Sequence, residues 1–157
     1  MSDRQDRLPR RGCRTVIGIA AAFLLHAFWS GAAVAAPCNA PRAVRFARGQ
    51  TAAEIRGGIA RGELDCRTFT ARAGQRLSAS VASVEHNVVF QLYRPGWRTA
   101  RNDGGFAVAG TALPGAGEGE DASSWSGNLP RTGSYLVVLG TTRGSGEYRL
   151  RLRILRR

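Results

Sequence analysis

The sequence predicts an all-β fold, an antiparallel β-sandwich of about eight short strands. Two observations support this prediction. Apolar residues recur with a period of two in several segments, and glycine-containing turn sequences separate those segments at short intervals. A period of two is the pattern of a strand with one buried face. Regularly spaced short strands divided by turns are typical of sandwiches and barrels.

The first 36 residues are predicted to be a signal peptide rather than part of the fold. Five arginines and two aspartates occur in the first 15 residues, and an apolar run follows over residues 16–29. Small residues then lead to Ala35 and Ala36. A basic start, a short apolar core and an A-x-A ending are the three parts of a secretory signal. A membrane-spanning helix needs about 20 apolar residues, so an uncleaved anchor is the weaker alternative.

Cleavage after Ala35 or Ala36 would leave residues 37–157, a length that suits one binding domain. The chain carries a formal net charge of +12, of which the predicted signal peptide holds +3, so the exported domain carries +9. A basic surface favours anionic envelope polymers, acidic proteins or nucleic acid. Export to the periplasm or beyond argues against nucleic acid, as does the lack of aromatic residues interleaved with the arginines.

The cysteines agree with export. Cys13 would leave with the signal peptide, and Cys38 and Cys66 would remain. Two cysteines in an oxidising compartment allow one intrachain bridge, so a Cys38–Cys66 disulfide is predicted. A metal site is the weaker alternative, because there is no C-x-x-C motif and His86 is the only histidine after the predicted signal.

The clearest strand prediction is residues 147–154, where apolar and charged residues alternate without a break. Further strands are predicted at residues 134–139, 88–93, 76–81, 43–48, 53–59, 64–71, 123–127 and 106–109. Alternation would turn Leu77, Ala79 and Val81 toward the core. A helix is conceivable only at residues 52–60, where two adjacent glycines argue against it.

Two segments differ from ordinary turns. Residues 110–122 are rich in glycine and carry Glu118, Glu120 and Asp121. Long loops of this kind are often functional or disordered. We expect disorder or a solvated loop here, with partner contact or calcium binding as alternatives.

Residues 94–103 form the second segment, a polar and basic stretch that is predicted to be a loop around Trp97. Tryptophan and arginine are enriched at binding hot spots, so Trp97 is a candidate partner contact. The alternative is a ring that folds back onto the edge of the sandwich.

The sequence offers little for catalysis. His86 is the only base available to a serine or cysteine nucleophile, and no G-x-S-x-G, phosphate-loop or dinucleotide motif occurs. Two of the acids at 118–121 could serve as the carboxylate pair of a glycosidase, but nothing in the sequence singles out two of them. We therefore expect a binding protein rather than an enzyme, with no catalytic residue, cofactor or metal.

The order of several strand and turn motifs resembles a group of exported proteins. The motifs include A-G-Q-R-L at residues 73–77, W-S-G-N-L-P-R-T-G-S-Y at residues 125–135 and S-G-E-Y at residues 145–148. They resemble the periplasmic inhibitors of g-type and invertebrate-type lysozymes, and also the bacterial pre-peptidase C-terminal domain, a β-sandwich of secreted enzymes. The resemblance covers about residues 43–154.

The resemblance implies a periplasmic protein that plugs the cleft of a lysozyme-type glycosidase with surface loops. The loop before the last strand would supply Arg143 and Ser145, with Tyr148 at its base, because S-G-E-Y looks like the S-G-x-Y motif of the invertebrate-type inhibitors. An arginine could pair with the catalytic carboxylates of the enzyme. The acids at 118–121 and Trp97 are further candidate contacts.

Two alternatives come from other classes. One is a module that binds an envelope polymer, peptidoglycan or lipopolysaccharide, through Arg149, Arg151 and Arg153 with Trp97, and that does not inhibit lysozyme. The same arginines could simply form a solvated strand face. The other is an enzyme that uses the acids at 118–121.

Overall fold

The computed structural model describes residues 38, 40–102 and 105–155, which form ten strands and no helix. All of them belong to the unit Gly31–Arg157. The predicted signal peptide lies outside the described residues, so export stays a prediction. The described part of the chain contains no apolar helix of membrane-spanning length.

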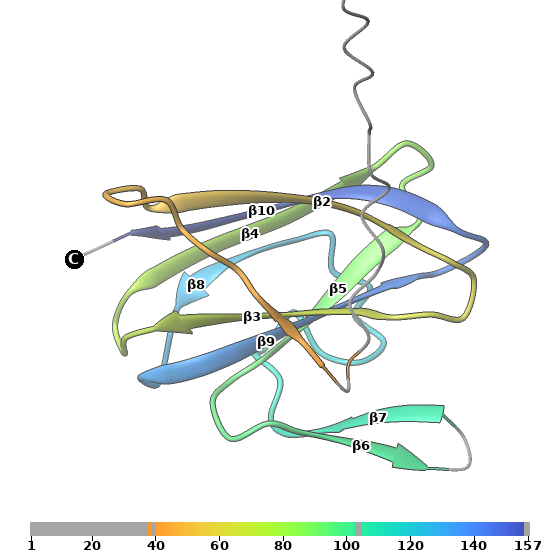
Figure 1. Cartoon of the computed structure of the whole chain (residues 1–157). Coiled ribbons are helices and arrows are strands. Elements are labelled where there is room, and N and C mark those ends of the chain that lie inside the picture. Colours follow the sequence, from red (N-terminus) through yellow and green to blue (C-terminus); the bar gives the residue numbers. More distant parts are fainter. Residues whose placement is uncertain (1–37, 39, 103–104, 156–157) are drawn as a thin grey trace, which may run out of the picture. The chain divides into compact units, whose positions relative to one another are not determined.

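Eight of the described strands form two four-stranded sheets, and the other two form a separate hairpin (Figure 1). One sheet has the order β1-β3-β9-β5 and the other β2-β10-β4-β8, while β6 pairs with β7. The bounds are β1 Arg42–Ala43, β2 Ala52–Ile59, β3 Asp65–Ala71, β4 Arg76–Ser83, β5 Val88–Tyr93, β6 Arg98–Asn102, β7 Gly105–Ala109, β8 Ser124–Asn128, β9 Gly133–Thr141 and β10 Gly146–Leu155. The predicted β-sandwich is therefore confirmed.

Strand β10 shows how the alternating sequence produces the core. Tyr148, Leu150 and Leu152 are at most 4% exposed, whereas the arginines between them point to solvent. β2 and β4 flank β10 in antiparallel register. Burying each such apolar side chain contributes about 1.5–3 kcal/mol. A slip of one residue would place arginines in the core, so the register is strongly specified.

Strand β9 is buried on both faces, as its unbroken apolar sequence indicates. Leu136 and Val138 point away from the main core but are less than 5% exposed. They belong to a second apolar cluster, against which Trp97 and the hairpin residues Phe106 and Val108 pack. The β6–β7 hairpin therefore covers the outer face of this sheet.

The hairpin corrects the prediction of a polar loop at residues 94–103. Arg98–Asn102 forms β6 and pairs antiparallel with β7. Its five residues, R-T-A-R-N, contain no large apolar side chain, so the strand was not visible in the sequence. Trp97 folds back onto the sheet, where its indole Nε1 donates a hydrogen bond to the carbonyl of Ser134 at 2.9 Å.

The first strand is shorter than predicted and runs in an unexpected direction. Only Arg42 and Ala43 form β1, which pairs parallel to β3. The chain must then leave this sheet, because β2 belongs to the other one. The predicted disulfide between Cys38 and Cys66 is present and connects this segment to β3.

The loop at residues 110–122, which was expected to be disordered or solvated, has a defined conformation in which Glu118, Glu120 and Asp121 are exposed to solvent. Leu113, Ala116 and Ala122 are buried in the main core, and backbone hydrogen bonds of 2.7–2.8 Å join them to β5. The carboxylate of Glu120 accepts hydrogen bonds from two backbone amides of the loop. The indole of Trp125 donates to a loop carbonyl at 2.8 Å. Hydrogen bonds within the loop and contacts with the core thus fix the conformation of this glycine-rich segment.

Replacing Cys38 and Cys66 together with alanine should lower the free energy of unfolding by about 3 kcal/mol. The bridge joins residues 28 positions apart and so restricts the unfolded chain. Urea denaturation followed by tryptophan fluorescence measures the change, and reductant should bring the unaltered protein close to the variant. Equal midpoints for the oxidised protein and the variant would contradict this account.

Candidate functional site

Three turns lie together at one end of the sandwich, on the right in Figure 1. They comprise residues 60–64 between β2 and β3, residues 84–87 between β4 and β5, and residues 142–145 between β9 and β10. We refer to them as the end turns. Two of the predicted partner contacts, Arg143 and Ser145, are exposed on the third of these turns.

Asn87 holds the turn at 142–145 in a defined conformation. It is only 2% exposed, and its side-chain nitrogen donates to the carbonyls of Arg143 and Ser145, both at 3.0 Å. Its own carbonyl accepts a hydrogen bond from the amide of Thr142 at 2.9 Å. Glycine at position 146 permits this close approach, because a Cβ there would lie 3.0 Å from the Asn87 Oδ1.

The exposed side chains of the third turn connect it to the other two. Ser145 Oγ accepts a hydrogen bond from the amide of Arg61 at 3.2 Å, which joins the first and third end turns. The guanidinium of Arg143 donates to the carbonyl of Glu85 at 3.2 Å, which joins the second and third. This guanidinium has no further partner among the described residues, so its other N–H groups are free to bind a ligand.

A buried polar cluster lies beneath the end turns. Arg67 donates to the Asp65 carboxylate at 2.7 Å and to the hydroxyl of Tyr148 at 3.2 Å. The Tyr148 hydroxyl donates to the same carboxylate at 2.5 Å. Asp65 directly follows the first end turn, and Tyr148 is the third residue after the last one. The cluster therefore connects both turns to the core.

Gly57 of β2 makes room for this cluster. A Cβ at that position would lie 2.7 Å from the hydroxyl oxygen of Tyr148 and 2.8 Å from its ring carbons. Real side chains do not approach so closely, so any larger residue would displace the ring. The glycine that argued against a helix at 52–60 thus has a packing role.

Burial and hydrogen bonding determine the protonation of the cluster. Burial raises the pKa of Tyr148, and its hydrogen bond to Asp65 raises it further. Burial acts to lower the pKa of Arg67, but the hydrogen bond and charge of Asp65 outweigh it, so the pKa is raised overall. Asp65 is fully buried between them. At neutral pH the phenol is protonated and the guanidinium is charged.

Tyr148 differs in position from the other residues of the predicted S-G-E-Y contact. It is 4% exposed, so it has no surface to offer a partner in this structure. Its hydroxyl is directed toward Asp65 and Arg67 instead. Tyr148 is therefore a positioning residue for the turn that carries Arg143 and Ser145.

The end turns have a charge balance unlike the +9 of residues 37–157. Their exposed charged side chains, with the adjoining Glu147, are two arginines and three glutamates: Arg61, Arg143, Glu63, Glu85 and Glu147. A depression of about 440 Å³ opens beside Ser145 between the ends of β2 and β10. This end can present a cation on a turn, surrounded by acidic groups.

The other predicted contacts lie elsewhere. Trp97 packs near the start of β9, at the end opposite the end turns. Glu118, Glu120 and Asp121 are exposed on the loop beside the edge of β5, and the Glu120 carboxylate is bonded to its own loop. The sequence therefore grouped residues that the fold separates.

The described residues contain no group of three or more histidine, cysteine or acidic side chains arranged to hold a metal ion. The acids at 118–121 do not converge on such a point. His86 is exposed in the second end turn, with a backbone φ of 51°. These observations leave the end turns as the best-defined candidate site.

Sequence reasoning missed three residues that shape this site: Asn87, Asp65 and Arg67. Asn87 stands next to a predicted strand, where asparagine reads as ordinary turn chemistry. Asp65 and Arg67 carried a stronger signal, because these two charged residues share a strand face with the apolar residues Phe69 and Ala71. Charged side chains on the buried face of a strand are rare unless they are paired with an opposite charge.

Tyr148→Phe should lower the free energy of unfolding by about 1–3 kcal/mol at neutral pH, because the Asp65 carboxylate loses a buried donor. The raised pKa of Tyr148 also predicts a pH effect. Above pH of about 10, the unfolded chain loses the phenol proton before the folded one, so stability falls as pH rises.

Urea denaturation between about pH 8 and about pH 11, where an ordinary tyrosine begins to ionise, measures both effects. The unaltered protein should lose stability more steeply at the alkaline end than Tyr148→Phe. Tyr93, whose pKa is also raised by burial, is present in both proteins and cancels in the comparison. Parallel pH profiles would show that the Tyr148 proton does not contribute.

No family model and no curated protein sequence matches the chain. Among solved structures, it is similar to PliG of Aeromonas hydrophila, described as a periplasmic lysozyme inhibitor of g-type lysozyme. The two are 23% identical, the match covers 78% of this chain and 98% of that one, and the TM-score is 0.56. A PliG mutant from Escherichia coli, with the same description, is 20% identical, with coverages of 79% and 100% and a TM-score of 0.52.

A pre-peptidase C-terminal domain of a collagenase from Bacillus anthracis is also similar. It is 15% identical, the match covers 72% of this chain and 96% of that one, and the TM-score is 0.41. The resemblance seen in the sequence is thus confirmed at the level of the fold. The chain has the β-sandwich fold of the periplasmic inhibitors of g-type lysozyme.

Proposed function

We propose that this protein is a periplasmic lysozyme inhibitor that inserts its end turns into the substrate cleft of a g-type lysozyme. The observation that carries the proposal is the exposed guanidinium of Arg143 on a turn held by Asn87. The fold shared with the PliG inhibitors supports the same function. The protein then acts by binding and is not itself an enzyme.

The geometry suits the target because glycosidases of this kind act through carboxylic acids in a cleft. A guanidinium offers two parallel N–H donors that match a carboxylate. Arg143 keeps donors available after its single bond to Glu85. Ser145, on the same turn, supplies a hydroxyl for a neighbouring polar group.

Rigidity of the turn matters for affinity. Ordering a flexible loop on binding costs about 1–2 kcal/mol for each residue whose backbone becomes fixed. Here the backbone is fixed beforehand by Asn87, and Tyr148 and Asp65 connect it to the core. A turn that is already in its binding conformation avoids most of this cost.

Charge supports the end turns as the contact surface. A basic enzyme would be repelled at long range by a protein with a charge of +9. Glu63, Glu85 and Glu147 offset the arginines of the end turns, so a basic partner can approach this part of the surface. The acids at 118–121 lie on a side edge, and we assign them no direct contact.

The proposed location follows from the predicted signal peptide and from the fold. The disulfide between Cys38 and Cys66 is of the kind that persists in oxidising compartments such as the periplasm. A periplasmic inhibitor would meet lysozyme that has crossed the outer membrane, before it reaches the peptidoglycan.

The purified protein should inhibit g-type lysozyme in a cell-wall lysis assay at micromolar concentration or below. Arg143→Ala should weaken the inhibition about tenfold or more, because one charged hydrogen-bonding contact is lost. Arg131→Ala is the matched control, since it removes the same charge from an exposed turn at the opposite end. That variant should inhibit like the unaltered protein.

Parallel assays with invertebrate-type and chicken-type lysozymes would define the range of targets. No inhibition of any of the three at micromolar concentration would overturn the proposal. Inhibition that Arg143→Ala and Arg131→Ala reduce equally would remove the end turns as its origin.

A further inference from the structure

The outer face of the β2-β10-β4-β8 sheet carries an exposed group of arginines. We call it the arginine face, and it contains Arg56, Arg76, Arg149, Arg151 and Arg153. The strand register places Ala52, Ser78 and Ser80 beside two of them, since Arg151 lies between Glu54 and Ser80, and Arg153 between Ala52 and Ser78. Long basic side chains therefore stand above a floor of alanine and serine.

One carboxylate within this face serves three guanidinium groups. Glu54 is bonded to Arg151 at 2.8 Å, to Arg56 at 3.2 Å and to Arg149 at 3.3 Å. The hydrogen bond from Arg151 is the main reason that the pKa of Glu54 is lowered. A single negative charge cannot neutralise three positive ones, so the face keeps a net positive charge.

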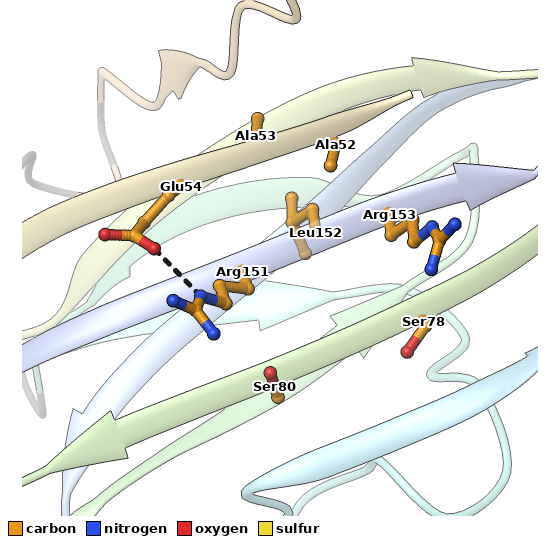
Figure 2. A pocket seen from close by; sticks show the side chains of 8 residues that line it. All are labelled: Ala52, Ala53, Glu54, Ser78, Ser80, Arg151, Leu152 and Arg153. Carbon is orange, nitrogen blue, oxygen red and sulfur yellow. Dashed lines mark hydrogen bonds and ion pairs between the residues drawn. The ribbon is translucent and has the colours of Figure 1, made fainter. Parts of the chain in front are cut away.

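Among the arginines of this face, Arg153 has the positive charge that is least offset by neighbouring groups. Its guanidinium has no hydrogen-bond or ion-pair partner among the described residues. Figure 2 shows Arg151 turned toward Glu54 and Arg153 pointing away from it along the strand. Between them and the small residues Ala52, Ser78 and Ser80 lies a groove of about 400 Å³.

The geometry points to a polyanion-binding site: the arginine face binds a saccharide chain that carries closely spaced phosphate or carboxylate groups. Alternate residues of a strand are about 6.6–6.8 Å apart, so Arg149, Arg151 and Arg153 form a regular column of cations. Arginine binds phosphate and carboxylate through two parallel donors. The hydroxyls of Ser78 and Ser80 can bond to sugar hydroxyls in the groove.

The side chains of the arginine face also limit the class of ligand that it can bind. The outward-facing residues of β2, β10, β4 and β8 that the structure describes include no aromatic ring. Nucleic-acid bases are commonly bound by stacking on such rings. Recognition here must therefore depend on ligand charge, and binding should weaken steeply as salt screens it.

This site is distinct from the end turns. It occupies the outer surface of a sheet, whereas Arg143 and Ser145 lie on a turn at the end of the sandwich. The inference does not rest on lysozyme inhibition. A protein with both properties would be retained at the charged envelope polymer while its end turns stay available.

Binding to immobilised lipopolysaccharide with a phosphorylated core tests the proposal. The double variant Arg151→Gln with Arg153→Gln should bind about tenfold or more weakly, since two charged contacts are lost. The control Arg72→Gln with Arg131→Gln removes the same charge from two exposed turns at the end opposite the end turns and should bind within about twofold of the unaltered protein. Raising salt from about 0.01 M to about 0.15 M shortens the screening length from about 30 Å to about 8 Å and should weaken binding.

Equal losses in the two double variants would overturn the inference, because net charge alone would then explain binding. Equal binding to lipopolysaccharide whose phosphates have been removed and whose carboxylates have been reduced to alcohols would also overturn it. Circular dichroism checks that each variant is folded. Lysozyme inhibition measured on the same proteins should be unchanged by Arg151→Gln with Arg153→Gln, so failure of this inference and failure of the proposed inhibition are distinguishable.

Discussion

The alternation of side chains along β10 is the constraint on which the rest of the structure depends. Leu150 and Leu152 must face the core, because both are fully buried there and burying each contributes about 1.5–3 kcal/mol. Once they do, the residues between them have to face solvent. The same register then fixes Tyr148 beneath the end turns and forms the arginine column on the opposite face. Core, turn support and charged surface are therefore consequences of one strand's register.

The cluster of Asp65, Arg67 and Tyr148 is an unusual way to complete that core. Removing a charged pair from water costs several kcal/mol per ion, and apolar residues of similar volume are often as stable or more so. Arg67 Nε even lacks a hydrogen-bond partner among the described residues. Such a cluster is more readily explained by what it specifies than by the stability it adds. Its directional hydrogen bonds fix the two strands that follow the first and last end turns, which is the requirement for a preformed binding turn.

The charges of this protein are distributed unevenly over two surfaces. Glutamates equal or outnumber arginines at the end turns, whereas the sheet face of β2, β10 and β4 has five arginines, three of which are paired with Glu54. A single net charge of +9 conceals this difference. The β6–β7 hairpin adds a third feature, since it covers the outer face of β9 and removes apolar surface that would otherwise be exposed. Rigid sheets thus keep two chemically different surfaces apart.

Most of the strands and the disulfide could be predicted from the sequence by itself, because alternation and turn glycines are local signals and two cysteines allow one pairing. The exceptions were β6, whose residues carry no apolar pattern, and the parallel pairing of β1. The tertiary structure alone decided that Asn87 bonds to Arg143 and Ser145, that Gly57 accommodates Tyr148, and that Trp97 turns away from the end turns. It also decided that Glu120 and Trp125 order the loop at 110–122. These contacts depend on which strands lie side by side in the two sheets. An alternating sequence shows which face of its strand a residue occupies, but it does not show which residues of other strands are its neighbours.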